Sequence, residues 1–179
     1  CGTVSLGGTI IVTPNNTNTL TSAAATANQT TCINTLITAI TYSTTTATGA
    51  TFSGLPAGVT GSWSSNVVTI SGTPSVAGTF NYTVTLTGGC GTVTANGTIT
   101  VTPDMVIGLT SAYPTTNQTL CIFNNITNIT YTAANATGAT FAGLPAGVTG
   151  SYTSGTILIS GSPTVSGLFL YTVTLTGGC

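Results

Sequence analysis

The chain has 179 residues with no lysine, arginine or histidine, and its one acidic residue is Asp104. Nucleic-acid binding requires basic side chains, and most hydrolytic or transfer chemistry requires a histidine, a carboxylate pair or an activated lysine. Calcium and magnesium require several carboxylates, and zinc requires closely spaced cysteine or histidine. The composition therefore predicts neither an enzyme nor a nucleic-acid-binding protein, and no metal or cofactor site. Asp104 itself is predicted to be a turn residue.

The predicted elements are all β-strands. In residues 80–87, Phe, Tyr, Val and Leu alternate with Asn and Thr, which is the period-two pattern of a half-buried strand. No segment shows a helical period. Strand patterns occupy residues 67–70, 80–87 and 93–101, and turn signals occupy residues 54–58, 71–74 and 87–89. Several short strands with regular turns predict a small β-sandwich.

The rest of the composition is that of a folded protein. Hydrophobic residues make up 41% of the chain and the formal net charge is −1, whereas disordered chains combine low hydrophobicity with high net charge. No apolar run reaches the ~18 residues of a transmembrane helix, and no signal peptide opens the chain. Because the first residue is Cys1, we interpret the chain as a mature form or a piece of a longer protein.

The sequence contains an internal repeat of 89 residues. Residues 47–62 read ATGATFSGLPAGVTGS, and residues 136–151 differ from them at one position. Residues 82–90 and 171–179 are both YTVTLTGGC. The chain is therefore two copies of one unit plus the first residue of a third, which we interpret as a window on a longer array or the repeating part of a polymer.

The domain boundaries are predicted at two Val-Thr-Pro sequences that end in Pro14 and Pro103, because proline cannot donate a hydrogen bond to a β-ladder. Residues 15–103 then form domain one. Residues 104–179 form domain two, which lacks a counterpart of the strand at 91–103. Residues 1–14 match that missing strand, so we interpret them as the last strand of a preceding repeat.

Domain two alone would have an unpaired sheet edge and an open core. Either the chain continues beyond Cys179, or residues 1–14 of a neighbouring copy fill the gap. The second arrangement is strand addition between subunits. It gives a head-to-tail contact, which propagates into a filament when the rotation does not close a ring.

The five cysteines amount to two for each repeat and one left over. Pairing within each domain gives Cys32–Cys90 and Cys121–Cys179, with Cys1 bonded to a neighbouring repeat. The rival pairing gives Cys1–Cys32 and Cys90–Cys121, which crosses both domain boundaries and leaves Cys179 over. Loop entropy hardly separates the two, and the domain frame favours the first. Buried free thiols are the alternative to disulfides.

The string GLPAGVTGSW…VVTISGTPSVAGTFNYTVTLTGGC resembles the immunoglobulin-like repeats of large secreted bacterial surface proteins, especially those of Bacteroidetes. Its turn and strand motifs lie at residues 54–59, 70–74 and 78–84, and recur in the second repeat. The resemblance implies tandem immunoglobulin-like domains that form an adhesin-like stalk, with one disulfide inside each domain. Many stalk repeats carry acidic calcium ligands, which this chain lacks, so disulfides would supply the rigidity.

Two asparagines, Asn28 and Asn117, hold the N-x-Thr glycosylation motif at equivalent positions of both repeats. We name them as glycosylation candidates because a surface almost without charge lacks the repulsion that keeps proteins dispersed. Trp63 and Tyr152 share a repeat position, and exposed aromatic residues can stack on sugars, although core packing is the plainer interpretation. A face of Thr83, Thr85, Thr87, Thr98, Thr100 and Thr102 would resemble an ice-binding surface, or simply face solvent.

The sequence therefore favours a structural component of an extracellular filament, fibre or cell-surface stalk, assembled from copies of itself or further repeats in a head-to-tail array. A glycan- or ice-binding adhesin-like module is the alternative.

Overall fold

The computed structural model describes residues 1–179. The chain forms two compact units, Cys1–Val101 and Thr102–Cys179. Each unit contains a two-layer β-structure, which we call domain one and domain two in chain order. The only helices are two short 3₁₀ turns, η1 (Ala24–Ala27) and η2 (Tyr113–Thr116). None of the helices has the length and apolar character needed to cross a bilayer. The predicted all-β architecture is confirmed.

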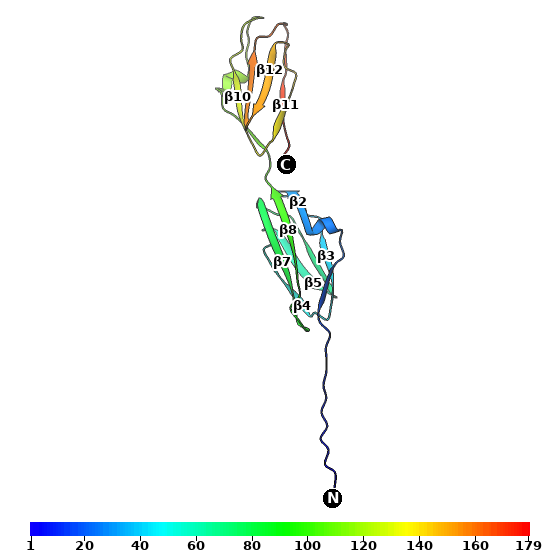
Figure 1. Cartoon of the computed structure of the whole chain (residues 1–179). Coiled ribbons are helices and arrows are strands. Elements are labelled where there is room, and N and C mark those ends of the chain that lie inside the picture. Colours follow the sequence, from blue (N-terminus) through cyan, green and yellow to red (C-terminus); the bar gives the residue numbers. More distant parts are fainter. The chain divides into compact units, whose positions relative to one another are not determined.

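Domain one is a sandwich of two four-stranded sheets (Figure 1). The first sheet has the order β1-β3-β6-β5, from β1 (Thr17–Leu20), β3 (Ile40–Thr45), β6 (Val67–Gly72) and β5 (Val59–Ser64). The second sheet has the order β2-β8-β7-β4, from β2 (Asn28–Cys32), β8 (Thr94–Thr102), β7 (Gly78–Thr87) and β4 (Gly49–Ser53). Strand β8 therefore has a hydrogen-bonded neighbour on both sides.

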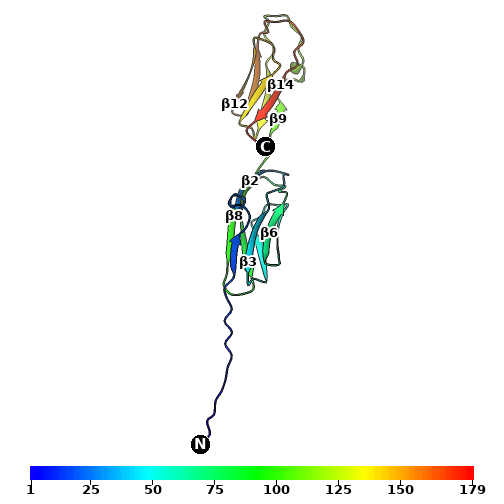
Figure 2. The ribbon, with the colours of Figure 1, turned by 90° about the vertical axis from the view of Figure 1, so that its right-hand side faces the viewer.

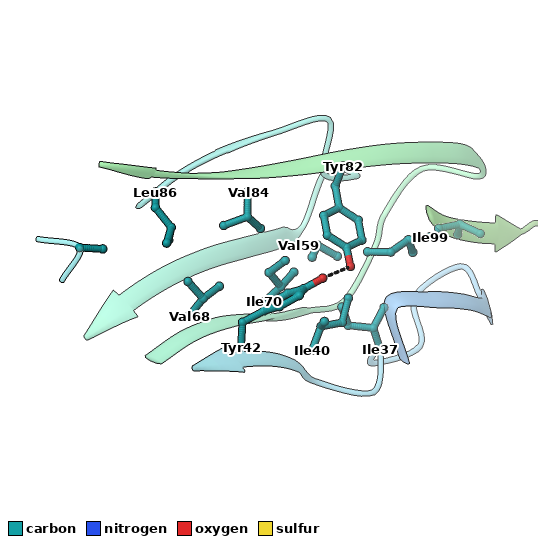
Figure 3. Packing of buried hydrophobic residues seen from close by; sticks show 12 residues of the cluster. Ile37, Ile40, Tyr42, Val59, Val68, Ile70, Tyr82, Val84, Leu86 and Ile99 are labelled. Carbon is teal, nitrogen blue, oxygen red and sulfur yellow. Dashed lines mark hydrogen bonds between the residues drawn. The ribbon is translucent and has the colours of Figure 1, made fainter. Parts of the chain in front are cut away.

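The core of domain one follows from the alternation of apolar and polar residues. In β7 the side chains of Tyr82, Val84 and Leu86 are buried, and the Thr residues between them face outward. They pack against Ile40 and Val68 of the opposite sheet, among other residues (Figure 3). The predicted strand at residues 80–87 and its inward face are confirmed.

The GLPAG turn joins β4 to β5 and requires glycine at both ends. Gly54 has φ 74° and Gly58 has φ 87°, a region that residues with a Cβ rarely adopt. A Cβ on Gly54 would also collide with the carbonyl oxygen of Asn81. The repeat keeps Gly143 and Gly147 at the matching positions, with φ 76° and 87°.

Domain two repeats one sheet completely and the other only in part. The complete sheet has the order β12-β13-β10-β9, from β12 (Val148–Thr153), β13 (Thr156–Gly161), β10 (Ile129–Ala134) and β9 (Val106–Leu109). The second sheet contains only β11 (Gly138–Ala142) and β14 (Thr172–Thr176), the latter labelled in Figure 2. The counterparts of β2 and β8 are absent.

Residues 1–14 belong to no strand and extend away from domain one, as the dark-blue segment in Figures 1 and 2 shows. All of them are exposed, and the apolar side chains of Leu6, Ile10 and Val12 are 101%, 90% and 87% exposed. A run of exposed apolar side chains on an extended backbone offers both hydrophobic surface and unpaired ladder groups.

Candidate functional site in domain two

The open side of domain two is the main candidate site of the molecule. In domain one, β7 spans ten residues from Gly78, and β2 covers residues 28–32. The equivalent segments of domain two behave differently, because β14 begins only at Thr172 and residues 117–121 form no strand. Both segments would flank a counterpart of β8, so each has lost the partner that makes it a strand.

This loss of structure does not come from the local sequence. Residues 82–90 and 171–179 are identical, yet Tyr82 lies within a strand and Tyr171 lies before one. A backbone N–H or C=O in a ladder needs a partner, and without one the extended segment gains nothing over other conformations. The unfilled position therefore leaves β14 paired with β11 alone and residues 117–121 outside any strand.

A groove lies between residues 117–121 and the segment that leads into β14. One part is a cavity of about 430 Å³ lined in part by Gln118, Ile126, Ile129 and Tyr171, and an adjoining part of about 440 Å³ is lined in part by Phe169. Most of the lining side chains are apolar, and no charged side chain is among them. The groove is thus suited to an uncharged, apolar segment that also offers backbone hydrogen bonds.

The core beneath the groove is correspondingly incomplete. Val84 and Leu86 are 0% and 4% exposed, whereas their equivalents Val173 and Leu175 are only half-buried. The hydroxyl groups of Tyr131 and Tyr171 lie 2.8 Å apart in a hydrogen bond. Partial burial raises the pKa of the Tyr171 phenol above its usual value, and its hydrogen bond with Tyr131 raises it further. Domain two keeps the inner pair of tyrosines but not the strand that should cover it.

Residues 1–14 are the natural match to the missing strand. They are identical to residues 90–103 at ten of 14 positions. Their C-terminal end is held against domain one, where the hydroxyl of Thr13 lies 2.5 Å from the sulfur of Cys90 and the backbone N–H of Asn16 donates to the Cys90 carbonyl at 2.8 Å. In domain two, Thr102 and Met105 make the equivalent contacts with Cys179, at 2.5 and 3.0 Å. Residues 4–12 carry no such contact.

The cysteines differ from the sequence prediction. Cys32 and Cys179 are disulfide-bonded, whereas Cys90, Cys121 and the exposed Cys1 are free thiols. The expected pairs Cys32–Cys90 and Cys121–Cys179 are therefore not formed, and the structure corrects this pairing.

The reason is that Cys32 and Cys90 lie at opposite ends of one sandwich. Asn34, two residues after Cys32, donates its N–H to the carbonyl of Pro74, which lies just before β7. Cys90 follows the other end of β7. A ten-residue strand spans ~30 Å, and a disulfide requires Cα atoms within ~7 Å. A disulfide between Cys32 and Cys90 is therefore incompatible with the geometry of the sandwich.

The glycosylation candidates Asn28 and Asn117 are both exposed. Asn28 opens β2, and its side-chain oxygen accepts a hydrogen bond from the backbone N–H of Thr98 in β8 at 3.1 Å. In domain two, where no strand fills this place, the side chain of Asn117 donates instead to Thr116 at 3.3 Å. The shared position of the two asparagines thus has a structural role, and their glycosylation stays a prediction.

The other sequence candidates occupy ordinary structural positions. Trp63 is half-buried against the core, and its indole N–H donates to the hydroxyl of Thr44 at 3.0 Å. The two threonine rows lie on neighbouring strands of one sheet but are displaced along it, because Thr83 faces Asn96 and Thr98 faces Asn81. Those two threonine hydroxyls bond to the asparagine side chains at 2.8 and 2.9 Å. Asp104 is exposed, and its carbonyl accepts from Asn135 at 2.8 Å.

Comparison with known proteins establishes the fold. No family model matches the chain, and no curated protein matches it. Similar solved structures include the I-band fragment I67–I69 of titin, with 7% identity and a TM-score of 0.54 over 83% of this chain and 62% of that one. An E-to-A variant of titin I67–I69 has 7% identity and a TM-score of 0.53 over 82% and 61%. The chain therefore spans about three fifths of the length of these fragments. The fold is an immunoglobulin-like β-sandwich.

Proposed function

We propose that this chain is a structural module of an extracellular filament, fibre or cell-surface stalk, in which immunoglobulin-like repeats follow one another head to tail. One observation carries the proposal. Domain two lacks a strand, and the same chain presents an exposed segment, residues 1–14, with the sequence of that strand. An unfilled strand position and a segment that matches it, both in one chain, support a series of such units.

The chemistry of the surface supports the same function. The chain offers no basic, histidine or paired acidic side chains for catalysis, so we assign it no enzymatic role. Disulfide-bonded Cys32 and Cys179 fit an oxidising environment such as the cell exterior. Sugar on Asn28 and Asn117 would keep such an uncharged surface dispersed.

Electron microscopy of the native material, together with denaturing gels run with and without reductant, tests this function. We expect fibres that are either very large covalent chains on both gels or ~18 kDa subunits held by non-covalent and disulfide contacts. Isolated monomers without fibres would overturn the structural role. The module would then be a binding domain, and a glycan array would be the next measurement.

A further inference from the structure

We propose that the groove of domain two binds residues 1–14 of a second copy of this chain as an antiparallel strand in one fixed register. This inference rests on the proposed function and names the joint between copies. The register follows from domain one, where Gly78 of β7 faces Val101 of β8 and Thr85 faces Thr94. Carried over by the 89-residue repeat, the pairs are Gly167–Val12, Leu168–Ile11, Phe169–Ile10, Leu170–Thr9, Tyr171–Gly8, Thr172–Gly7, Val173–Leu6 and Thr174–Ser5.

In this register the apolar side chains of residues 1–14 fall on the correct face. Ala95, Ile99 and Val101 of β8 point into the core of domain one, and the last two are 0% and 2% exposed. The corresponding residues of the free segment are Leu6, Ile10 and Val12. A slip by one residue would turn all three toward solvent, so the hydrophobic pattern fixes the register.

Gly8 is the residue that the groove requires most strictly. In β8 its equivalent is Gly97, where an added Cβ would collide with the hydroxyl of Tyr82 and the carbonyl oxygen of Ala27. Tyr171 and Thr116 stand at the matching places of domain two, and Tyr171 lines the groove. Only glycine leaves room for the tyrosine pair beneath the incoming strand.

A second pair shows that residues 1–14 match domain two better than β8 would. On the outer face of domain one, Thr79 faces Thr100. At the equivalent positions, Leu168 of domain two stands opposite Ile11 of the free segment, so both partners of one cross-strand pair are apolar together. Leu168 and Ile11 are 88% and 83% exposed in the separate chain. Each partner thus exposes one large aliphatic side chain to water, and pairing the two would bury both.

Asn117 completes the site on the far side of the strand. Its equivalent Asn28 accepts the backbone N–H of Thr98 in domain one. Asn117 would accept the backbone N–H of Thr9 in the same way, and residues 117–121 would regain the strand that β2 forms in domain one. The donated strand would therefore have a hydrogen-bonded neighbour on both sides, as β8 does.

The test uses the 179-residue chain with Gly8→Leu, which keeps the groove but cannot donate its own strand. A fluorescent peptide of residues 1–14 with Cys1→Ser should bind it at a 1:1 ratio. The same peptide with Gly8→Leu should not bind. The control is a peptide with Gly7→Asn, because the residue equivalent to Gly7 in β8 is Asn96, whose side chain faces outward. This control should bind as the parent peptide does. Ile11→Thr should weaken binding by up to about fivefold.

Two further measurements test where the peptide binds and whether a second copy of the chain occupies the groove. Hydrogen exchange should slow at residues 117–121 and 167–171 when the peptide binds, and sedimentation should show wild-type chains associating with concentration while Gly8→Leu chains stay monomeric. Equal binding of the parent and Gly8→Leu peptides, or no binding by either, overturns the register. Wild-type chains that stay monomeric overturn the second copy as the occupant. Fibres in the native material without peptide binding would leave the structural function intact and place the joint elsewhere.

Discussion

The hydroxyl groups of Tyr42 and Tyr82 meet inside domain one at 3.0 Å, and their hydrogen bond joins the two sheets of the sandwich (Figure 3). Tyr82 also donates to the carbonyl of Ala27 at 3.3 Å, so Tyr42 is the donor between the two hydroxyls. Period-two alternation in residues 80–87 predicts that Tyr82 is a core residue. It does not reveal the contact with Tyr42, because the two strands lie far apart in the sequence.

Replacing Tyr82 with Phe is therefore expected to destabilise domain one more than replacing Tyr42 with Phe. Tyr82→Phe leaves the Tyr42 hydroxyl and the Ala27 carbonyl without their partner, whereas Tyr42→Phe leaves Tyr82 bonded to Ala27. We expect a loss of ~1–3 kcal/mol for Tyr82→Phe and less for Tyr42→Phe. Urea unfolding followed by the fluorescence of Trp63, the single tryptophan, reports domain one alone.

Tyr131→Phe is the matched control, because it removes the equivalent bond from domain two and should leave the Trp63 transition unchanged. Equal losses for the Tyr42 and Tyr82 variants would contradict the direction of hydrogen bonding in this network.

The stability of domain one should fall at alkaline pH. Burial raises the pKa of the Tyr82 phenol above its usual value of about 10, and the neighbouring Tyr42 raises it further. The unfolded chain then releases this proton first, so the stabilisation is complete below about pH 10 and is lost as the pH rises above it. Urea unfolding at several pH values from about 8 to 12 should show this decline, and Tyr82→Phe should make it shallower. An unchanged slope in the variant would exclude Tyr82 as its source.

The sequence predicted the all-β sandwich, the strand at residues 80–87 and its inward face, and these are confirmed. It did not predict that residues 117–121 and 167–171 would fail to form strands. Residues 171–179 have the same local sequence as residues 82–90 of domain one, so propensity cannot distinguish them. A strand depends on its neighbour, and the neighbour is the part that domain two lacks.

The cysteine pairing was mispredicted for a related reason. Sequence spacing gives the length of a loop but does not say which end of a sandwich the loop occupies. Cys32 and Cys90 share a domain and yet lie at the two ends of β7. The separation of the two cysteines becomes visible only in the folded arrangement of the strands, which places the turn before β7 beside Cys32.

Copies joined through the groove should become covalently linked on oxidation. In the proposed register, Cys121 of the accepting copy lies at the end of the groove where Val12 of the donated strand faces Gly167. The Cys90 sulfur of the donating copy lies at the same end, because it is 2.5 Å from the hydroxyl of Thr13. With oxidised glutathione as the oxidant, the two thiols give up two protons and two electrons and form the disulfide. A non-reducing gel should show a ladder of multiples that collapses on reduction. Cys90→Ser or Cys121→Ser should remove the ladder, and Cys1→Ser should preserve it.

Asn18 in β1 is a site where domain one can be stabilised. Its side-chain nitrogen and oxygen are buried and have no hydrogen-bond partner. The equivalent residue of the second repeat is Ile107. Asn18→Ile removes two unsatisfied polar atoms and places a β-branched residue in a strand, so we expect a gain of ~1 kcal/mol in the Trp63-reported unfolding free energy. Thr19→Ile, on the exposed side of the same strand, should change it by less; an equal gain would assign the effect to strand propensity.

Because the free strand and the open groove belong to the same chain, an assembly of these copies has a direction. One end always presents an unoccupied groove, and the other always presents an unpaired strand. A Gly8→Leu chain can accept a neighbour but cannot be added to a groove, so it can only begin a series. A peptide of residues 1–14 does the opposite and closes the end that it reaches. Length is then set by the ratio of such terminators to ordinary copies, without any change in the strength of the individual joints.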